Sequence, residues 1–148
     1  MSAGLNIRVA TLEDLSAVND VKRDASLVAD EYRESLLAHP ELLTVAEDEI
    51  DAGDVLVAEA DGRVVGVIAV DHGDHLEITG LFVRHADWKR GIGRRLLDDA
   101  IARFDGTPPM IVRVTASPDA EPFYRRCGFV TIGGTSTRFG PAVLMRRG

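Results

Sequence analysis

The chain has little of several features that would define its class, beginning with cysteine. Cys127 is the only cysteine among 148 residues, which excludes an internal disulfide framework and a cysteine-rich zinc site. Long apolar runs are also missing: Val64 to Val70 is the longest, far short of the roughly 18 residues of a membrane helix. No cationic segment followed by an apolar one opens the chain, so we expect no signal peptide. These absences predict a cytoplasmic protein with no membrane partner.

An excess of basic residues is lacking as well. Lys and Arg total 17 against 24 Asp and Glu, a net charge of −7, whereas nucleic-acid binders usually carry a basic excess. No nucleic-acid partner is therefore expected. The charge is uneven, because residues 1–61 hold 15 acidic and four basic side chains and residues 62–148 hold nine and 13. This division favours an anionic ligand for the second part and weakly a cationic one for the first; two oppositely charged solvent faces are the alternative.

The periodicity predicts one α/β domain over residues 1–148, with a single mixed sheet. Thr11 and Asp14 form a capping-box variant before a first helix, and Asp61-Gly62 is a strong hairpin signal. Residues 25–51 read as two short helices interrupted at Pro40. Further helices are expected at 91–104 and 119–126. The expected strands are 7–10, 55–60, 64–70, 75–83, 110–115, 129–132 and 142–145.

Five basic residues surround the start of the helix expected at Gly91: Arg84, Lys89, Arg90, Arg94 and Arg95. A helix N-terminus has unpaired N–H groups and a partial positive charge, so bases there are unfavourable unless an anion binds. Gly91 and Gly93 would let a phosphate approach the backbone. The alternative is a solvent-exposed face on which Arg94 and Arg95 pair with Asp98 and Asp99.

This glycine pair fits neither of two common nucleotide motifs. A Walker P-loop requires Gly-Lys-Ser/Thr, which does not follow, and a dinucleotide fingerprint requires a third glycine where Leu96 stands. Four scattered histidines show no metal-ligand spacing, so no metal is expected.

Two segments carry a resemblance to a known family. Leu81-Phe-Val83 followed by Trp88-Lys-Arg-Gly-Ile-Gly-Arg-Arg-Leu-Leu97 resembles the acetyl-CoA signature of the GCN5-related N-acetyltransferases (GNAT), Gln/Arg-x-x-Gly-x-Gly/Ala. Ala120 to Phe129 is similar to the family's Ala-x-x-Phe-Tyr-x-x-x-Gly-Phe segment. Trp88 stands where the family has Gln or Arg, which a one-residue deletion before Gly91 would equally explain. Ser117 stands where many members have Asn.

The resemblance implies a GNAT-like α/β fold: a central mixed, mostly antiparallel sheet flanked by helices on both faces. It implies acetyl transfer from acetyl-CoA, as co-substrate, to a primary amine by direct attack in a ternary complex. The residues implied to bind the cofactor are Leu81, Phe82, Val83, Trp88, Lys89, Arg90, Gly91, Ile92, Gly93, Arg94, Ser117 and Tyr124. The backbone N–H of Phe82 or Val83 would stabilise the oxyanion.

Tyr124 is the implied acid for the departing thiolate, with a core-packed tyrosine as the alternative. Glu77 is the candidate base, through a water; His72 and His75 are rivals, and a solvent-facing glutamate is the alternative.

The amine acceptor, a small molecule or a peptide, would meet an acidic surface near the first helices: Asp24, Asp30, Glu31, Glu34, Glu41, Glu47, Asp48 and Glu49. Plain helix surface is the alternative. A homodimer through the last strands is a family habit. A catalytically silent acyl-CoA sensor, or a partner-binding module on the same fold, remains the alternative function.

Overall fold

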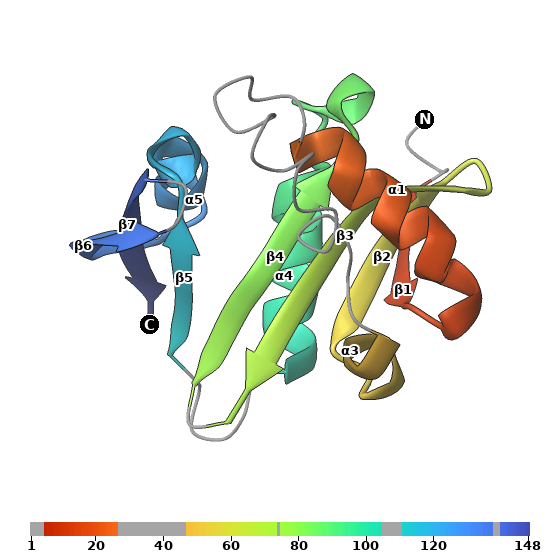
Figure 1. Ribbon diagram of the computed structural model, residues 1–148, viewed down its shortest axis with the longest axis horizontal. Coiled ribbons are helices and arrows are strands. Elements are labelled where there is room, and N and C mark those ends of the chain that lie inside the picture. Colours follow the sequence, from red (N-terminus) through yellow and green to blue (C-terminus); the bar gives the residue numbers. More distant parts are fainter. Residues whose placement is uncertain (1–4, 27–46, 74, 105–110, 138–139) are drawn as a thin grey trace. The chain divides into compact units, whose positions relative to one another are not determined.

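The structure is a mixed sheet of seven strands with helices (Figure 1). This computed structural model describes residues 5–26, 47–73, 75–104, 111–137 and 140–148. The strands are β1 (Leu5–Val9), β2 (Val55–Ala60), β3 (Arg63–His72), β4 (Leu76–Val83), β5 (Val112–Ala116), β6 (Val130–Thr137) and β7 (Gly140–Arg147). The helices are α1 (Leu15–Ser26), α3 (Glu47–Asp51), α4 (Ile92–Phe104) and α5 (Glu121–Arg126), and single 3-10 turns lie at Leu12–Asp14, His85–Asp87 and Pro118–Ala120.

Hydrogen bonding orders the strands β1-β2-β3-β4-β5-β7-β6. The β4–β5 pair is parallel, and β1–β2, β2–β3, β5–β7 and β6–β7 are antiparallel. The mixed, mostly antiparallel sheet expected from the sequence is therefore confirmed. Among the residues just given, no helix combines the length and apolar character needed to cross a membrane.

The chain forms two compact units that share β3, β4 and α4. The first unit holds Met1–Ala69 and Gly80–Ala100, and the second holds Val70–Thr79 and Ile101–Gly148. Because the chain passes between the units inside regular elements, neither unit is a continuous stretch of sequence. The expectation of a single domain stays a prediction.

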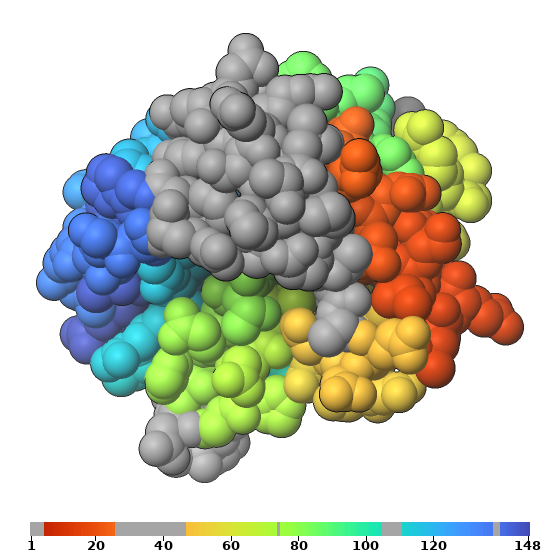
Figure 2. Space-filling view, viewed as in Figure 1, coloured from red at the N-terminus to blue at the C-terminus, as the bar shows by residue number. Residues whose placement is uncertain are grey.

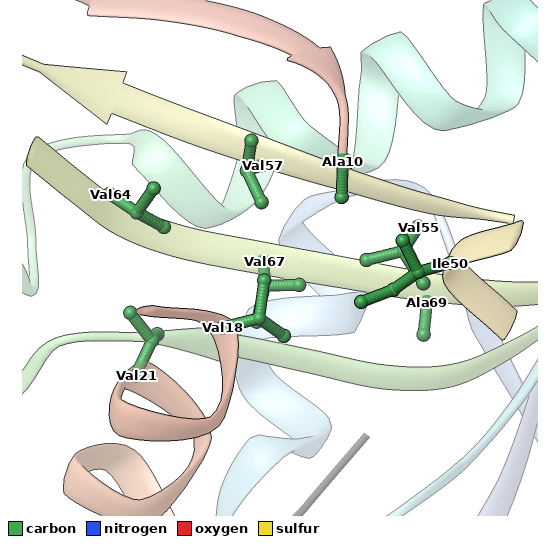
Figure 3. Close-up of a cluster of buried hydrophobic side chains, with 9 residues drawn as sticks. All are labelled: Ala10, Val18, Val21, Ile50, Val55, Val57, Val64, Val67 and Ala69. Carbon is green, nitrogen blue, oxygen red and sulfur yellow. The ribbon is translucent and has the colours of Figure 1, made fainter. Parts of the chain in front are cut away.

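The core of the first unit lies between α1 and the sheet (Figure 3). Val18 and Val21 of α1, three residues apart on one helical face, are fully buried. They belong to a cluster of nine side chains: Ala10, Val18, Val21, Ile50, Val55, Val57, Val64, Val67 and Ala69. Alternate residues of a strand face the same side, so Val55 and Val57 of β2 and Val67 and Ala69 of β3 can all meet α1.

Helix α4 covers the opposite face of the same strands (Figure 1). Gly66 of β3 allows this close approach, since a Cβ there would lie 2.9 Å from Leu96 Cδ1 and 3.1 Å from Ile92 Cγ2. Leu96 is fully buried and Ile92 nearly so, so neither could move aside cheaply. The bare backbone of β3 thus determines where the first turns of α4 lie.

In the second unit, β4 pairs with β5 through only three positions, Leu76–Ile78 with Val112–Val114. Strand β5 then pairs with β7, and β7 with β6. Buried side chains of β5, α5 and β7, with Phe129 just before β6, form its interior; they include Val114, Tyr124 and Met145.

The last two strands are longer than the sequence predicted. Residues 129–132 and 142–145 were expected to be strands, whereas β6 and β7 each have eight residues. Gly133-Gly134 favours a loop on propensity. Antiparallel pairing with β7 satisfies their backbone groups despite a register shift between Thr131 and Gly133, so tertiary pairing overrides the local preference.

Most other boundaries agree within two residues, and the hairpin expected at Asp61-Gly62 is present between β2 and β3, with φ 53° at Asp61 and 78° at Gly62. The predicted capping box is confirmed as well: the Thr11 N–H donates to Asp14 Oδ2 at 2.8 Å. Of the two helices expected in residues 25–51, α3 is described, and residues 27–46 lie outside the described part of the chain.

Asp14 also accepts two hydrogen bonds from Arg8, at 2.7 and 2.9 Å. These bonds, against the opposing cost of burial, lower the pKa of Asp14 from an ordinary 3.8 to about 2. A lowered carboxyl pKa contributes stability that is complete above the unfolded-state pKa and is lost as the pH falls through the folded-state pKa.

Asp14→Asn should therefore lower the free energy of unfolding by about 2 kcal/mol at pH 7 and by much less near pH 2. Urea unfolding of both proteins across this pH range measures the difference. Glu13→Gln, which changes an exposed neighbouring acid, should keep the wild-type pH dependence. A parallel loss of stability in wild type and Asp14→Asn on acidification would contradict the assignment.

Candidate functional site

The turn between β4 and α4 lies against the first residues of β3. The Arg84 N–H donates to the Val65 carbonyl at 2.8 Å, and Arg84 Nε donates to the Val64 carbonyl at 3.1 Å. The next residues form the 3-10 turn His85–Asp87, which the sequence did not predict. Asp24 of α1 accepts the His85 N–H at 2.8 Å. The turn is thus held from two sides before it reaches the glycines.

Two residues just before α4 have left-handed backbone conformations. Lys89 has φ +66° and Gly91 has φ +79°. This region is open to glycine and costs other residues roughly 1–2 kcal/mol, so the strained Lys89 is held there by its surroundings. A Cβ on Gly91 would meet no atom within 4 Å, so the space beside it is open.

The geometry of this turn suits an anion. Gly91 is exposed, and α4 begins at the next residue with its unpaired N–H groups and the positive end of its dipole. Lys89 and Arg90 are exposed beside it. The residues present therefore fit a phosphate group held by backbone N–H groups, as predicted for acetyl-CoA.

Not every predicted residue can contribute a side chain here. Ile92 is buried and packs towards Gly66, so only its backbone is available to a ligand. Arg94 Nε lies 3.9 Å from Asp98 Oδ2, which is the helix-surface pair given as the alternative, but the Arg94 side chain is 61% exposed and stays available to a ligand. Gly93 is partly buried within the first turn of α4.

Trp88 links the turn back to the end of β4. Its indole N–H donates to the Val83 carbonyl at 2.7 Å, while 44% of the residue stays exposed. Its ring also meets His85 edge-on at a centroid distance of 4.7 Å. The side chain therefore restrains the turn and leaves an aromatic surface facing solvent.

The last residues of β4 are only partly buried. Leu81, Phe82 and Val83 share this exposure, and the Phe82 ring folds over Gly80, whose Cβ would lie 2.7 Å from it. Lys22 Nζ of α1 lies 5.5 Å from the centre of the Phe82 ring, and burial lowers the pKa of this lysine. No sequence pattern pointed to Lys22, because only packing brings α1 to β4.

Tyr124 and Ser117 belong to the second unit. Tyr124 is buried, with Phe123 and Phe129 edge-on at 5.0 and 5.4 Å. Burial, with a smaller contribution from Cys127, raises the pKa of Tyr124 well above its ordinary 10.0, so the phenol keeps its proton at neutral pH. Ser117 follows β5 and is exposed, and its carbonyl accepts the Ala120 N–H at 3.0 Å.

Glu77, the candidate base, also belongs to the second unit. Its Oε1 lies 3.1 Å from His75 Nε2, so two of the candidate bases form one pair. An open cavity of about 160 Å³ is lined by Asp71, His72, Gly73, His75 and Glu77. His72 stacks on Phe104 at 5.3 Å. Within the described residues, no three side chains converge in a way that could hold a metal.

Sequence reasoning missed Asp87, which is buried at 7% exposure in the middle of the basic turn. Its Oδ1 accepts from Arg90 Nη1 at 3.3 Å, and Arg63 Nη2 of β3 lies 3.7 Å from its Oδ2. An acid among bases was a visible signal. Its burial depends on contact with β3, however, and a pattern of neighbouring residues cannot predict a contact with a distant strand.

Comparison with known proteins agrees with this arrangement. The family model of the acetyltransferase (GNAT) domain matches residues 28–143. Because this match spans most of the chain, the protein belongs to the GNAT acetyltransferase family. The class of protein is therefore an acetyltransferase with the GNAT domain.

Solved structures share the fold across nearly the whole chain. The PaiA N-acetyltransferase of Thermoplasma acidophilum, in complex with coenzyme A, has a TM-score of 0.78 at 21% identity, covering 97% of this chain and 98% of that one. The ribosomal-protein-S18-alanine N-acetyltransferase of Escherichia coli has a TM-score of 0.72 at 14% identity, covering 97% and 92%. Ard1 of Thermoplasma volcanium has 0.70 at 21%, covering 97% of each chain. At these identities the likeness establishes the fold.

Gly91→Glu should weaken CoA binding at least tenfold, because its carboxylate would stand where a phosphate is expected and repel it. Gly53→Glu is a matched control: Gly53 has φ +80° and nothing within 4 Å of its Cβ position, but it lies before β2. Both variants should lose similar stability, and only Gly91→Glu should lose affinity in calorimetric titration. Equal affinities would remove the turn from the binding site.

Proposed function

We propose that the chain is an acetyl-CoA-dependent N-acetyltransferase that moves the acetyl group to a primary amine by direct attack in a ternary complex. The observation that carries the proposal is the open, base-lined turn before α4, in a chain of the GNAT family. Backbone N–H groups of Gly91 to Gly93 and the side chains of Lys89 and Arg90 would hold the phosphates of the co-substrate. Ser117 and the edge of β4 at Leu81 to Val83 complete the proposed binding set.

The incomplete pairing of β4 supports a role for its backbone. Partners in β5 reach only to Ile78, while β4 continues to Val83. Those backbone N–H groups beyond Ile78 that point away from β3, the other hydrogen-bonded neighbour of β4, are therefore available to the thioester arm and, at Phe82 or Val83, to the developing oxyanion. Acetyl-CoA would supply the activated acetyl group.

Tyr124 is proposed to donate a hydrogen bond to the departing sulfur. Full proton transfer from this phenol is uphill, because its pKa is raised whereas that of a thiol is about 8.5. A hydrogen bond requires only that the phenol stay protonated, and burial ensures this at neutral pH. The raised pKa thus favours stabilisation of the thiolate over complete protonation by Tyr124.

An attacking amine must first lose a proton, because most amines are protonated at neutral pH. The Glu77 carboxylate, paired with His75, is the proposed acceptor of that proton through water. Both groups line an open cavity, so a water chain can reach them from solvent.

The acceptor is proposed to be a cationic small molecule or a peptide amine drawn to the acidic first part of the chain. The segment that contains α3 lies at the surface, in orange-yellow in Figure 2, and Glu47 and Asp48 at its start are exposed. Asp24 is different, because its carboxylate already accepts the His85 N–H and so supports the turn before α4. Asp30, Glu31, Glu34 and Glu41 lie outside the described residues.

Two further proposals concern the setting of the protein. A lone thiol and the use of a CoA thioester suit the reducing cytoplasm. A homodimer through the last strands would cover Val130 and Ile132 of β6, which are 56% and 50% exposed.

Calorimetric titration with acetyl-CoA, CoA and ATP, followed by thiol-release assays with a panel of amines, tests the function. Micromolar binding of acetyl-CoA and CoA, weak binding of ATP and amine-dependent release of CoA are expected. Binding without release for any amine would favour the silent acyl-CoA sensor. Absence of binding by folded protein would favour the partner-binding module.

Tyr124→Phe should lower kcat about 10- to 100-fold, the value of a hydrogen bond to a charged group, and leave the Kd of CoA nearly unchanged. Phe123→Leu is the control for packing, because Phe123 touches the Tyr124 ring and the change leaves the hydroxyl in place. A similar fall in kcat for both variants would assign Tyr124 a packing role.

A further inference from the structure

Asp87 is one of two buried charged residues in the described part of the chain, and the other is Asp14. Asp14 has an evident structural use, because Arg8 and the Thr11 N–H satisfy its oxygens. Asp87 is poorly satisfied by comparison. Its Oδ2 has no hydrogen-bond partner among the described residues, and a buried carboxylate without full pairing destabilises a fold.

The two guanidiniums beside Asp87 are mostly free to face solvent. The side chains of Arg63 and Arg90 are 64% and 68% exposed, and each guanidinium has five N–H donors in one plane. Arg90 directs one donor to Asp87 at 3.3 Å, and Arg63 approaches to 3.7 Å, just beyond hydrogen-bond distance. A single carboxylate thus gathers two long cationic side chains that come from different elements.

The position of this cluster ties it to the turn before α4. Asp87 ends the 3-10 turn that the Arg84 N–H and the Val65 carbonyl hold against β3. Arg90 directly precedes Gly91, the open left-handed residue. The outer donors of Arg90 therefore lie beside the start of α4, where an anion would bind.

We propose that Asp87 is a positioning residue for the phosphates of CoA: its carboxylate holds Arg63 and Arg90 in place, so that their outer N–H groups meet the ligand already ordered. This inference rests on the proposed function. Ordering two flexible side chains in advance removes a cost that binding would otherwise include. The net charge of the three groups stays positive, so the acid does not cancel the attraction for phosphate.

The sign of the effect separates positioning from simple electrostatics. Asp87→Asn removes a negative charge near the site, so electrostatics alone predicts tighter binding of CoA. Positioning predicts weaker binding, by about tenfold, because both arginines lose their anchor. Pantetheine, which lacks phosphates, should bind wild type and variant equally. A general disturbance of the fold would weaken both ligands.

The experiment compares calorimetric Kd values of CoA and pantetheine for wild type, Asp87→Asn and Asp14→Asn, the last being a matched control that loosens a buried Asp–Arg pair outside the turn. Weaker CoA binding by Asp87→Asn alone supports the proposal. Equal or tighter binding overturns it, as does a matching loss in Asp14→Asn. If wild type binds no CoA, the proposed function fails together with the inference. If wild type binds CoA and Asp87→Asn binds it with equal or higher affinity, only the inference fails.

Arg63→Gln provides a second measurement that does not depend on Asp87→Asn folding, because it changes an exposed side chain. It should raise the Kd of CoA severalfold in wild type, since Arg63 is proposed to meet a phosphate. In the Asp87→Asn background, where that variant folds, the same change should have a smaller effect, because Arg63 is no longer held. No change in wild type would overturn the inference.

Discussion

The close contact of α4 with bare backbone at Gly66 is the constraint on which the candidate site depends. Leu96 and Ile92 occupy the space that any side chain at this position of β3 would need, so the first turns of α4 lie directly on the strand. The peptide hydrogen bond from Arg84 to Val65 holds the chain to the same strand as it leaves β4. The turn that holds the left-handed Lys89 and Gly91 lies between these two attachments.

Electrostatics then explains the composition of the turn. Bases at a helix N-terminus oppose the helix dipole, so a cluster of them there is unfavourable unless negative charge compensates it. Asp87 supplies one negative charge from within the protein, paired with Arg90 and near Arg63, yet positive charge remains in excess. The excess of positive charge that is unfavourable in the free protein attracts a negatively charged ligand. In the proposal made above, buried Asp87 holds the arginine side chains in the orientation that meets this ligand.

The sequence predicted local structure correctly where the motif and the element that it specifies lie in the same short segment. The capping box at Thr11 and Asp14, the hairpin at Asp61-Gly62 and the helix from Ile92 involve neighbours in the chain, so short-range rules find them. The strands β6 and β7 exceeded their predicted lengths because pairing between them outweighs the low strand propensity of Gly133-Gly134. Residues selected from the family resemblance divided between the two units, with the glycine turn in one and Tyr124 in the other.

The order of elements, the mixed sheet, the glycine turn among bases and the family were all readable from the 148 residues, because each depends on periodicity or on a contiguous motif. Burial and pairing were decided only in three dimensions. Asp87 is buried, Lys22 lies over the Phe82 ring, and Glu77 lies 3.1 Å from His75, and no local pattern predicted these contacts. Such contacts depend on which faces of separate elements meet, and packing determines this after each element has formed.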